Sequence, residues 1–428
     1  MPRRSVTYAT KERTSPMELP GPVSTDQVSP VPIRYMGTKR PIAPRVRRLV
    51  DDLEPEGRVV DLFCGMGSVA SCLAPRYPVI ANDALEFAGA LARARFTTQT
   101  RTPLAEVLPR LRSVYRDHLE RLTRAYRRRV RTETAVLEGG WKDLAQYMAG
   151  APHAGNSVRW AKAARDAHVL RGAARYCLTT LYFSAGYFST RQALALDAIR
   201  RAIDQAPHDD RDWLLSAWLS SAATVINAPG HTAQYLKPND ANSYSRIRRA
   251  WRRDVWETFK SRLADVGPVG TCAWRRRNEV HTSDAVHLLQ GKLRRVGLVY
   301  ADPPYTKDHY SRYYHVYETL YRYDFPNSSG AGRYRADRFR TQFSLATRVR
   351  PVFDTLLGAL RRYKVPLILS YPDDGLLVKT GTDVRTLLQT YYGSVTVEQF
   401  AAQHSTLGAS KGTQQKGAKE NLYVCIPG

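Results

Sequence analysis

Residues 58–68 read RVVDLFCGMGS, and this stretch decides the fold. Its apolar start predicts a short buried strand, its two glycines predict a tight turn, and the small residues that follow predict a helix. Residues 78–82, PVIAN, predict a second short strand that leads to Asp83. A strand, a glycine-rich turn, a helix and a second strand are typical of the start of a doubly wound α/β sheet.

The rest of the chain divides into a helical middle and a strand-containing last third. Further strands are expected at 296–301, 366–370 and 421–426. Arginine-rich helices are expected in between, for example at 104–136, 160–182 and 244–263. The predicted parts are a flexible basic tail at 1–30, the first part of an α/β domain at 31–96, a long helical insertion at 97–275 and the second part of the α/β domain at 276–428.

The charge of the chain is strongly positive. Of its 428 residues, 65 are Lys or Arg and 39 are Asp or Glu, which gives a formal net charge of +26. An excess of this size favours a polyanionic partner such as nucleic acid or an anionic membrane, although a general bias toward arginine would also produce it.

The composition excludes several classes of protein. With 43% apolar and 24% charged residues, the chain is neither mainly disordered nor fibrous, and no apolar run has the length of a membrane span. The five cysteines are widely spaced and form no Cys-x-x-Cys pair, so neither a disulfide framework nor a metal site is expected. The first residues contain no apolar signal segment, and we expect a cytoplasmic protein.

The glycine-rich turn carries candidate binding residues. Gly65 and Gly67 let a ligand approach the backbone closely, while Asp61 and Asp83 end the two strands. Taken alone, the turn also fits a nicotinamide- or flavin-dependent oxidoreductase. A pyrophosphate would be repelled by the carboxylate of Asp61, however, whereas the ammonium and sulfonium of S-adenosylmethionine would be attracted.

The sequence VGLVYADPPY at 296–305 is the most informative motif. Its apolar strand delivers Asp302 to the carboxyl edge of the sheet, where ligands bind in open α/β folds. The prolines stiffen the turn and lack N–H donors, so Pro303 offers a carbonyl that only accepts. Tyr305 adds a planar ring. Two acceptors beside a ring match the exocyclic amino group of a nucleobase.

Three motifs together resemble the Dam-like, alpha-group DNA adenine-N6 methyltransferases. They are YMGTK at 35–39, DLFCGMG at 61–67 and DPPY at 302–305, and their order matches that family. The similarity spans roughly 33–96 and 280–425, and the insertion between them is not matched. The second motif begins with Asp-Leu, where Glu-Pro or Asp-Pro is common in the family.

The resemblance implies an α/β fold of the Rossmann-like methyltransferase type, S-adenosylmethionine as cofactor, and a target-recognition role for the insertion. It implies cofactor-binding roles for Tyr35, Gly37, Lys39, Asp61, Phe63, Gly65, Gly67, Asp83 and Asp284, with Lys39 pairing with the cofactor carboxylate and Asp83 binding its ribose. The catalytic residues implied are Asp302, Pro303 and Tyr305.

The implied reaction is site-specific methylation of the N6 amino group of a flipped-out adenine in double-stranded DNA. The same acceptors would also serve the N4 amino group of cytosine. A DNA-binding module with an inactive methyltransferase fold is a further alternative.

Arginine-rich segments supply the candidate DNA contacts, each of which is equally consistent with a solvated surface. These residues are Arg248, Arg249, Arg252, Arg253, Arg275, Arg276, Arg277, Arg335 and Arg338. We expect a monomer that acts at the nucleoid without membrane contact, in company with a cognate restriction nuclease or other defence proteins.

Overall fold

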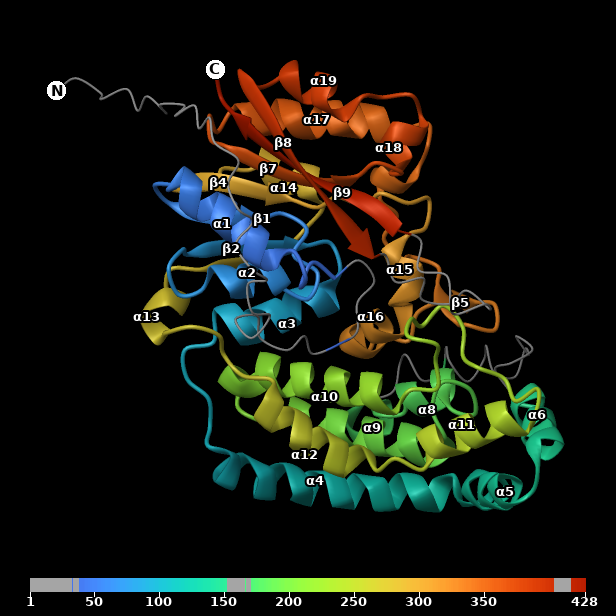
Figure 1. Cartoon of the computed structure of the whole chain (residues 1–428). Coiled ribbons are helices and arrows are strands. Elements are labelled where there is room, and N and C mark those ends of the chain that lie inside the picture. Colours follow the sequence, from blue (N-terminus) through green and yellow to red (C-terminus); the bar gives the residue numbers. More distant parts are fainter. Residues whose placement is uncertain (1–32, 34–37, 152–165, 167–170, 404–416) are drawn as a thin grey trace.

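The computed structural model describes residues 33, 38–151, 166, 171–403 and 417–428. Its upper half in Figure 1 is a sheet with helices on both faces, and its lower half is a layer of helices. The predicted tail at 1–30 lies outside the described residues, as do most of 160–170. None of the described helices is long and apolar enough to cross a membrane.

The central sheet has seven strands and is mostly parallel. Their order is β3-β2-β1-β4-β7-β9-β8, and β9 runs antiparallel to both of its neighbours. The strands are β1 (Arg58–Asp61), β2 (Val79–Asp83), β3 (Glu279–Thr282), β4 (Val296–Ala301), β7 (Leu367–Pro372), β8 (Ser394–Gln403) and β9 (Gly417–Ile426). The predicted Rossmann-like α/β fold is thereby confirmed.

Alternating side chains of the strands feed two apolar layers, one on each face of the sheet. Val59 of β1 packs on the first face, and Val60 packs on the second. Helices of the first face are α1 (Ala43–Leu53), α2 (Ser68–Leu73) and the end of α3 (Glu86–Phe96). Helices of the second face are α14 (Ala285–Gln290), α17 (Val349–Arg361) and α19 (Val384–Gln389).

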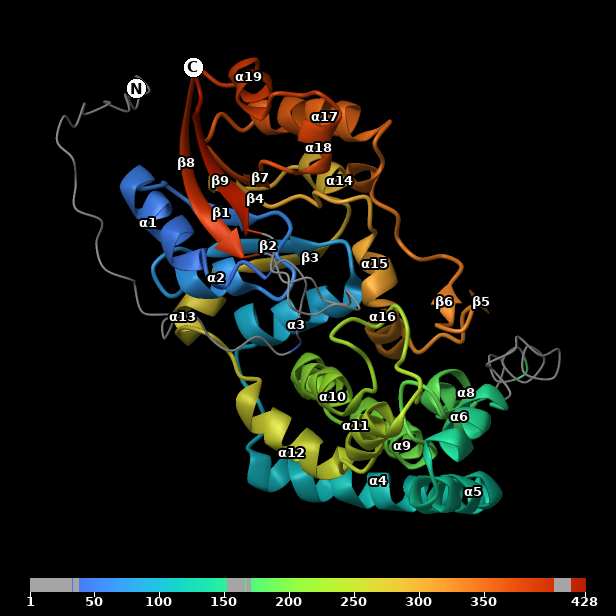
Figure 2. The same ribbon diagram turned by 45° about the vertical axis from the view of Figure 1, so that its right-hand side comes forward.

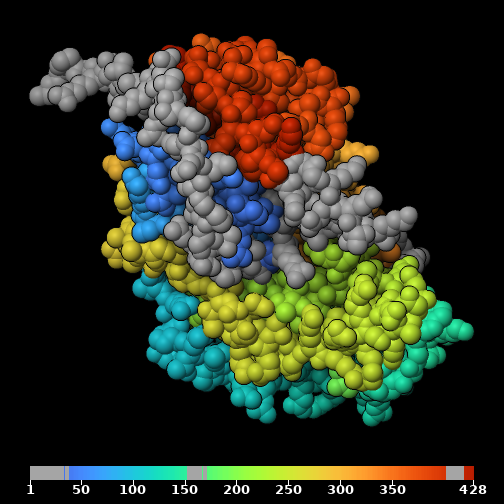
Figure 3. All heavy atoms as spheres, viewed as in Figure 1, coloured from blue at the N-terminus to red at the C-terminus, as the bar shows by residue number. Residues whose placement is uncertain are grey.

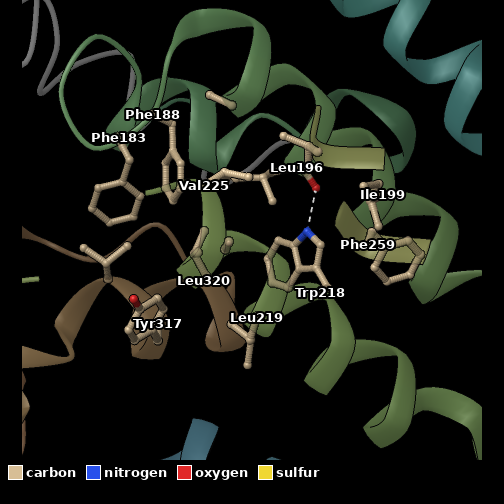
Figure 4. Packing of buried hydrophobic residues seen from close by; sticks show 14 of the residues in the cluster. Phe183, Phe188, Leu196, Ile199, Trp218, Leu219, Val225, Phe259, Tyr317 and Leu320 are labelled. Carbon is tan, nitrogen blue, oxygen red and sulfur yellow. Dashed lines mark hydrogen bonds between the residues drawn. The ribbon is translucent and has the colours of Figure 1, made fainter. Parts of the chain in front are cut away.

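The lower half is built from α4 (Leu104–Ala125), α5 (Arg127–Glu138), α6 (Trp141–Ala149), η2 (Gly172–Arg175), α8 (Leu178–Phe183), α9 (Thr190–Asp204), η3 (His208–Asp210), α10 (Arg211–Val225), α11 (Ala241–Trp251) and α12 (Val255–Asp265). Helix α13 (Cys272–Arg275) leads back to the sheet. The fully buried Trp218 of α10 lies at the centre of this half (Figure 4), where its indole N–H donates to the Leu196 carbonyl at 3.1 Å.

The chain after β4 joins the two halves. It forms α15 (Tyr310–Tyr313), α16 (His315–Arg322), the short hairpin β5 (Ser328–Ser329) and β6 (Tyr334–Arg335), and η4 (Gln342–Ser344), while α18 (Leu376–Lys379) follows β7. Helix α16 packs against both α3 and α10, as the turned view in Figure 2 shows. Because α3 begins shortly after β2, these contacts between the two halves lie close to the carboxyl edge of the sheet.

Candidate active site

The candidate residues gather at the carboxyl edge of the parallel strands. Asp61 and Asp83 end β1 and β2, Asp284 lies two residues beyond β3, and Asp302 directly follows β4. Since β3, β2, β1 and β4 are parallel neighbours, their carboxyl ends meet at one edge. Residues that are far apart in the sequence therefore line a common region.

The glycine-rich turn lines a small cavity, and its conformation is fixed by contacts with neighbouring residues. Gly67 has φ +71°, and a Cβ there would lie 2.5 Å from Cζ of Phe96. Gly65, with φ +49°, donates its backbone N–H to Oδ2 of Asp83 at 2.9 Å. The buried Arg95 guanidinium donates to the Met66 carbonyl at 2.6 Å. Both glycines thus adopt the left-handed conformation, and the turn is clamped from α3.

The carboxylate of Asp61 is buried and has one unmet acceptor. Its Oδ2 accepts the backbone N–H of Ala70 at 3.3 Å, whereas its Oδ1 is buried with no hydrogen-bond partner. Burial raises the pKa of Asp61 to about 8, against the opposing effect of the Ala70 N–H. An arriving cation with N–H donors would satisfy the free oxygen and favour the ionised form.

Asp83 organises the start of α3 and faces a cavity. Its Oδ1 accepts the backbone N–H of Leu85 at 2.9 Å, and its Oδ2 accepts that of Gly65. Burial raises its pKa to about 6, although these backbone donors act in the opposite direction. Each oxygen keeps a second lone pair, so the side chain still has acceptor capacity for hydroxyl groups.

Lys39 lies between two buried carboxylates. Its Nζ is 3.0 Å from Oδ1 of Asp302 and 2.9 Å from Oε1 of Glu420, which also accepts the Ser370 hydroxyl at 2.6 Å. Burial alone would lower the pKa of Lys39, but the two carboxylates outweigh it and raise the pKa well above its usual value. Burial raises the pKa of Asp302, and Lys39 opposes that rise. We call Lys39, Asp302 and Glu420 the ion triad.

The motif at 302–305 forms a rigid shelf after β4. Pro303 is buried, and Pro304 lines a cavity. The backbone carbonyl of Tyr305 accepts the N–H of Leu376 at 2.7 Å, which ties this shelf to α18. The Tyr305 ring lies with its centroid 5.3 Å from Nζ of Lys39. The shelf therefore places a carboxylate and an aromatic ring close to one ammonium group.

Two adjoining cavities meet at Phe63 and Asp302. The first is the larger of the two and is lined by Asp83, Asp284, Pro304 and Tyr310 among others. The second is smaller and is lined by residues of the ion triad and the glycine-rich turn, including Lys39, Asp61, Gly65 and Asp302. A ligand with a cationic amino-acid end and a nucleoside end matches this pair, because the unmet acceptor of Asp61 lies in the smaller cavity and Asp83 lies in the larger one.

Several predicted cofactor residues have structural partners of their own. Oδ1 of Asp284 accepts the backbone N–H groups of Val286 at 2.9 Å and His287 at 3.2 Å, so it caps α14 while its residue lines the larger cavity. The ammonium of Lys39 is engaged by the ion triad. Tyr35 and Gly37 lie outside the described residues.

Sequence reasoning missed two residues that shape the site. Glu420 comes from β9, whose antiparallel pairing places Pro372 opposite Glu420. Arg95 lies in α3 and donates to the Met66 carbonyl of the turn. In the sequence it looks like an ordinary surface arginine of a helix. The exposed fraction of each is at most 3%, and both carry a formal charge, which is a signal that only the three-dimensional structure reveals.

The predicted DNA-contacting arginines fall into different environments. Arg335 is 1% exposed and pairs with Asp324 and Asp337, so it is a structural ion pair and not a surface cation. The segment 275–277 precedes β3 and lies at the amino edge of the sheet, opposite the site. Arg338 lies near the larger cavity, next to Phe339 in its lining.

The remaining predicted arginines belong to α11 and the turn after it. Arg248 and Arg252 both pair with Glu138, and Arg253 donates to the Thr224 carbonyl. Arg249 is exposed. These residues lie in the helical half of the molecule.

Comparison with known proteins agrees with this geometry. Residues 35–119 and 271–357 match the model of the D12 class N6 adenine-specific DNA methyltransferases, and these segments contain the three motifs. The chain is 21% identical over 354 residues to the modification methylase StsI of Streptococcus sanguinis, covering 81% of this chain and 44% of that protein. It is 21% identical over 353 residues to the modification methylase LlaI of Lactococcus lactis subsp. lactis, covering 81% of this chain and 47% of that protein.

The chain thus spans about half the length of the curated relatives that it matches. The family match begins at the YMGTK motif, includes the glycine-rich turn and contains the Asp-Pro-Pro-Tyr motif. The parallel sheet, the acidic residues at its carboxyl edge and the matched motifs all lead to one family. Over these two segments the chain is similar to the D12 class N6 adenine-specific DNA methyltransferases.

Proposed function

We propose that this protein transfers a methyl group from S-adenosylmethionine to the N6 amino group of an adenine in double-stranded DNA. The observation that carries the proposal is the position of Asp302, which lies at the junction of the two cavities and within 3.0 Å of the Lys39 ammonium. One cavity has the acceptor for a cationic amino acid, and the other has the acidic residues for a nucleoside.

The residues present fit the cofactor that this family uses. Asp61 would bind the ammonium group through its unmet Oδ1, and Asp83 would bind the ribose hydroxyls. Asp284 lines the same cavity as Asp83 and would accept from the adenine amino group of the cofactor. S-adenosylmethionine supplies an electrophilic methyl group on a sulfonium.

The shelf at 302–305 would prepare the target amino group. Asp302 and the Pro303 carbonyl accept its two hydrogens, which localises the nitrogen lone pair toward the methyl carbon. Transfer of the methyl group from the sulfonium, which would leave as the neutral thioether, would give an amino nitrogen with one proton to lose. The Asp302 carboxylate is suited to accept that proton, because burial raises its pKa.

The base must leave the DNA stack before it reaches this shelf, which costs a few kcal/mol. Stacking on the Tyr305 ring would return about 1–3 kcal/mol of that cost. The helical half, which Figure 3 shows as a broad layer below the sheet half, would then hold the surrounding duplex and read its sequence. We thus propose that residues 97–275 recognise the target sequence.

The proposal extends to the biological setting. Both matched relatives are named modification methylases, and we infer a corresponding role here, with a restriction nuclease as the functional partner and the nucleoid as the place of action. The default state in this proposal is a monomer.

The direct test is to incubate the protein with genomic DNA and S-adenosylmethionine and then to analyse the nucleosides by mass spectrometry. N6-methyladenine is expected, and it should disappear in Asp302→Asn. The matched control is Asp354→Asn on α17, which removes a half-buried carboxylate that pairs with Arg350, accepts the Tyr391 hydroxyl and lines neither cavity. Detection of N4-methylcytosine would show that the target is the N4 amino group of cytosine and not adenine. Absence of both products, with cofactor and DNA binding intact, would leave a DNA-binding module and refute the enzymatic role.

A further inference from the structure

Three arginines lie beside the lining of the larger cavity. Arg312 follows Ser311, while Arg338 and Arg340 flank Phe339, and both Ser311 and Phe339 line the cavity together with Asp302. Arg312 and Arg340 are exposed, and Arg338 is half-buried. We call Arg312, Arg338 and Arg340 the rim arginines.

Other arginines of the same segment are neutralised by carboxylates. Arg335 pairs with Asp324 and Asp337, and Arg322 lies within 4 Å of both of these and of Glu86. For the rim arginines, no carboxylate partner within 4 Å is found among the described residues. The segment thus contains arginines that pair directly with carboxylates and, in the rim arginines, cations without such a direct pair in the part of the chain that the structure describes, although Tyr334 and Asp308 raise the pKa of Arg312.

Arg312 and Arg340 lie close enough to Arg338 to affect the pKa of its guanidinium group. Burial lowers the pKa of Arg338, and Arg340 and Arg312 lower it further. Burial also lowers the pKa of His309, with Arg338 and Arg340 adding to the effect, so this lining residue is neutral at pH 7. Nε of Arg338 is buried without a hydrogen-bond partner. An anion at this rim would relieve the repulsion and supply acceptors.

One aromatic ring, that of Tyr334, contacts two of the three rim arginines. The guanidinium carbons of Arg312 and Arg338 each lie 5.7 Å from the centroid of Tyr334. The Tyr334 hydroxyl donates to the Ala233 carbonyl, and the ring lies 4.7 Å from the ring of the buried His315. Cations stacked on a fixed ring lose less side-chain freedom when they bind.

We propose that the rim arginines bind the sugar–phosphate backbone of the DNA next to the nucleotide that enters the site. This inference rests on the proposed function, which it extends from the reacting base to the strand that carries it. The anionic group of S-adenosylmethionine is its carboxylate, which belongs to the amino-acid end that we place in the smaller cavity beside Asp61. The anion at the rim of the larger cavity is therefore assigned to a phosphodiester of the DNA. Planar guanidinium groups suit phosphate oxygens, which accept two parallel hydrogen bonds.

The test is the salt dependence of DNA binding by the variant Arg312→Gln/Arg338→Gln/Arg340→Gln. The probe is a short DNA duplex without cofactor. Each lost phosphate contact reduces the slope of log affinity against log salt concentration by about 0.9, so the triple variant should lose up to about 2.7. The matched control changes Arg350, Arg361 and Arg385 to Gln. These three are exposed on α17 and α19 and carry the same total charge.

The expected result is a reduced slope and a raised KM for DNA in the rim variant, with unchanged affinity for S-adenosylhomocysteine and a nearly unchanged slope in the control. An unchanged slope in the rim variant would overturn the inference, as would an equal reduction in the control, which would show an effect of net charge alone. A different result would contradict the proposed function, namely that the unaltered protein methylates no DNA. Unaltered affinity for S-adenosylhomocysteine also shows that the rim variant is folded.

Discussion

Replacing Lys39 by Met is the most informative single change, because it leaves two buried carboxylates without their shared cation. Nζ of Lys39 is 3.0 Å from Asp302 and 2.9 Å from Glu420, and these three side chains are between 2% and 15% exposed. Removing one partner of a buried ion pair lowers the free energy of unfolding by about 3–5 kcal/mol. We expect a loss in that range at pH 8.

The loss should shrink as the pH falls. Burial raises the pKa of Asp302 above its value in the unfolded chain, and removal of Lys39 takes away the effect that opposes this rise. The folded variant therefore binds protons more readily than the unfolded chain. Stability of the variant is lowest at high pH, where the Asp302 carboxylate is ionised, and part of it returns as the pH falls toward about 4, the ordinary range of an aspartate.

The assay is urea unfolding of the unaltered protein and of Lys39→Met at pH 8 and pH 5. Adding Glu420→Gln to Lys39→Met removes one of the two carboxylates and should restore about 1–3 kcal/mol at pH 8. The control is Lys260→Met, which breaks an exposed pair with Glu257 on α12 and should cost about 0.5 kcal/mol or less. Equal losses at the two pH values, with no recovery in the double variant, would refute the reasoning.

Three further substitutions test the glycine-rich turn, the carboxylate proposed to bind the cofactor and the carboxylate proposed to bind the target amino group. Gly67→Ala should cost about 1–3 kcal/mol in thermal unfolding, because φ is +71° and its Cβ would lie 2.5 Å from Phe96, and Phe96→Leu should recover part of that loss. Asp61→Asn should weaken S-adenosylhomocysteine binding by about 10- to 100-fold in calorimetry. Since the pKa of Asp61 is about 8, lowering the pH from 7 to 6 should weaken binding to the unaltered protein by up to about tenfold but should leave the Asn variant nearly unaffected. Asp302→Asn should reduce kcat by about 10²- to 10³-fold with cofactor affinity retained, and equal activity would exclude the acceptor role.

The central strands could be predicted from the sequence, whereas the edge strands could not. The runs at 58–61 and 296–301 are apolar because β1 and β4 are buried inside the sheet. Strands β3 and β8 lie at its two edges, where one side has no neighbouring strand. Their sequences, EVHT and SVTVEQFAAQ, carry more polar residues and show no comparable apolar run.

In the helical insertion, the sequence predicted helices but not the residues at which they begin and end. The expected helix at 244–263 is divided, because Asp254 accepts the backbone N–H of Glu257 at 2.8 Å and starts α12 afresh. The expected helix at 104–136 changes direction at Tyr126. A cap inside a continuous amphipathic pattern is a local feature, and the pattern of apolar residues alone does not reveal it.

Some residues of the candidate site could be predicted from the local sequence, whereas others depend on contacts between distant segments. Asp61 and Asp302 were identified because each follows an apolar strand at a motif, so local sequence carries the information. Glu420 was not identified, because its place beside Lys39 depends on the pairing of β9 with β7. Arg335 and Arg338 are three residues apart and look alike in the sequence, yet acidic neighbours neutralise the first and not the second.

The arrangement of β9 also has a consequence for the order in which the site assembles during synthesis. Glu420 is 381 residues beyond Lys39 in the chain, and β9 occupies a position between β7 and β8, both of which are translated earlier. While the ribosome has yet to release this segment, β7 and β8 lack the strand that separates them, and Lys39 has one carboxylate partner in place of two. The growing chain therefore lacks a complete ion triad until β9 has been synthesised and has entered the sheet.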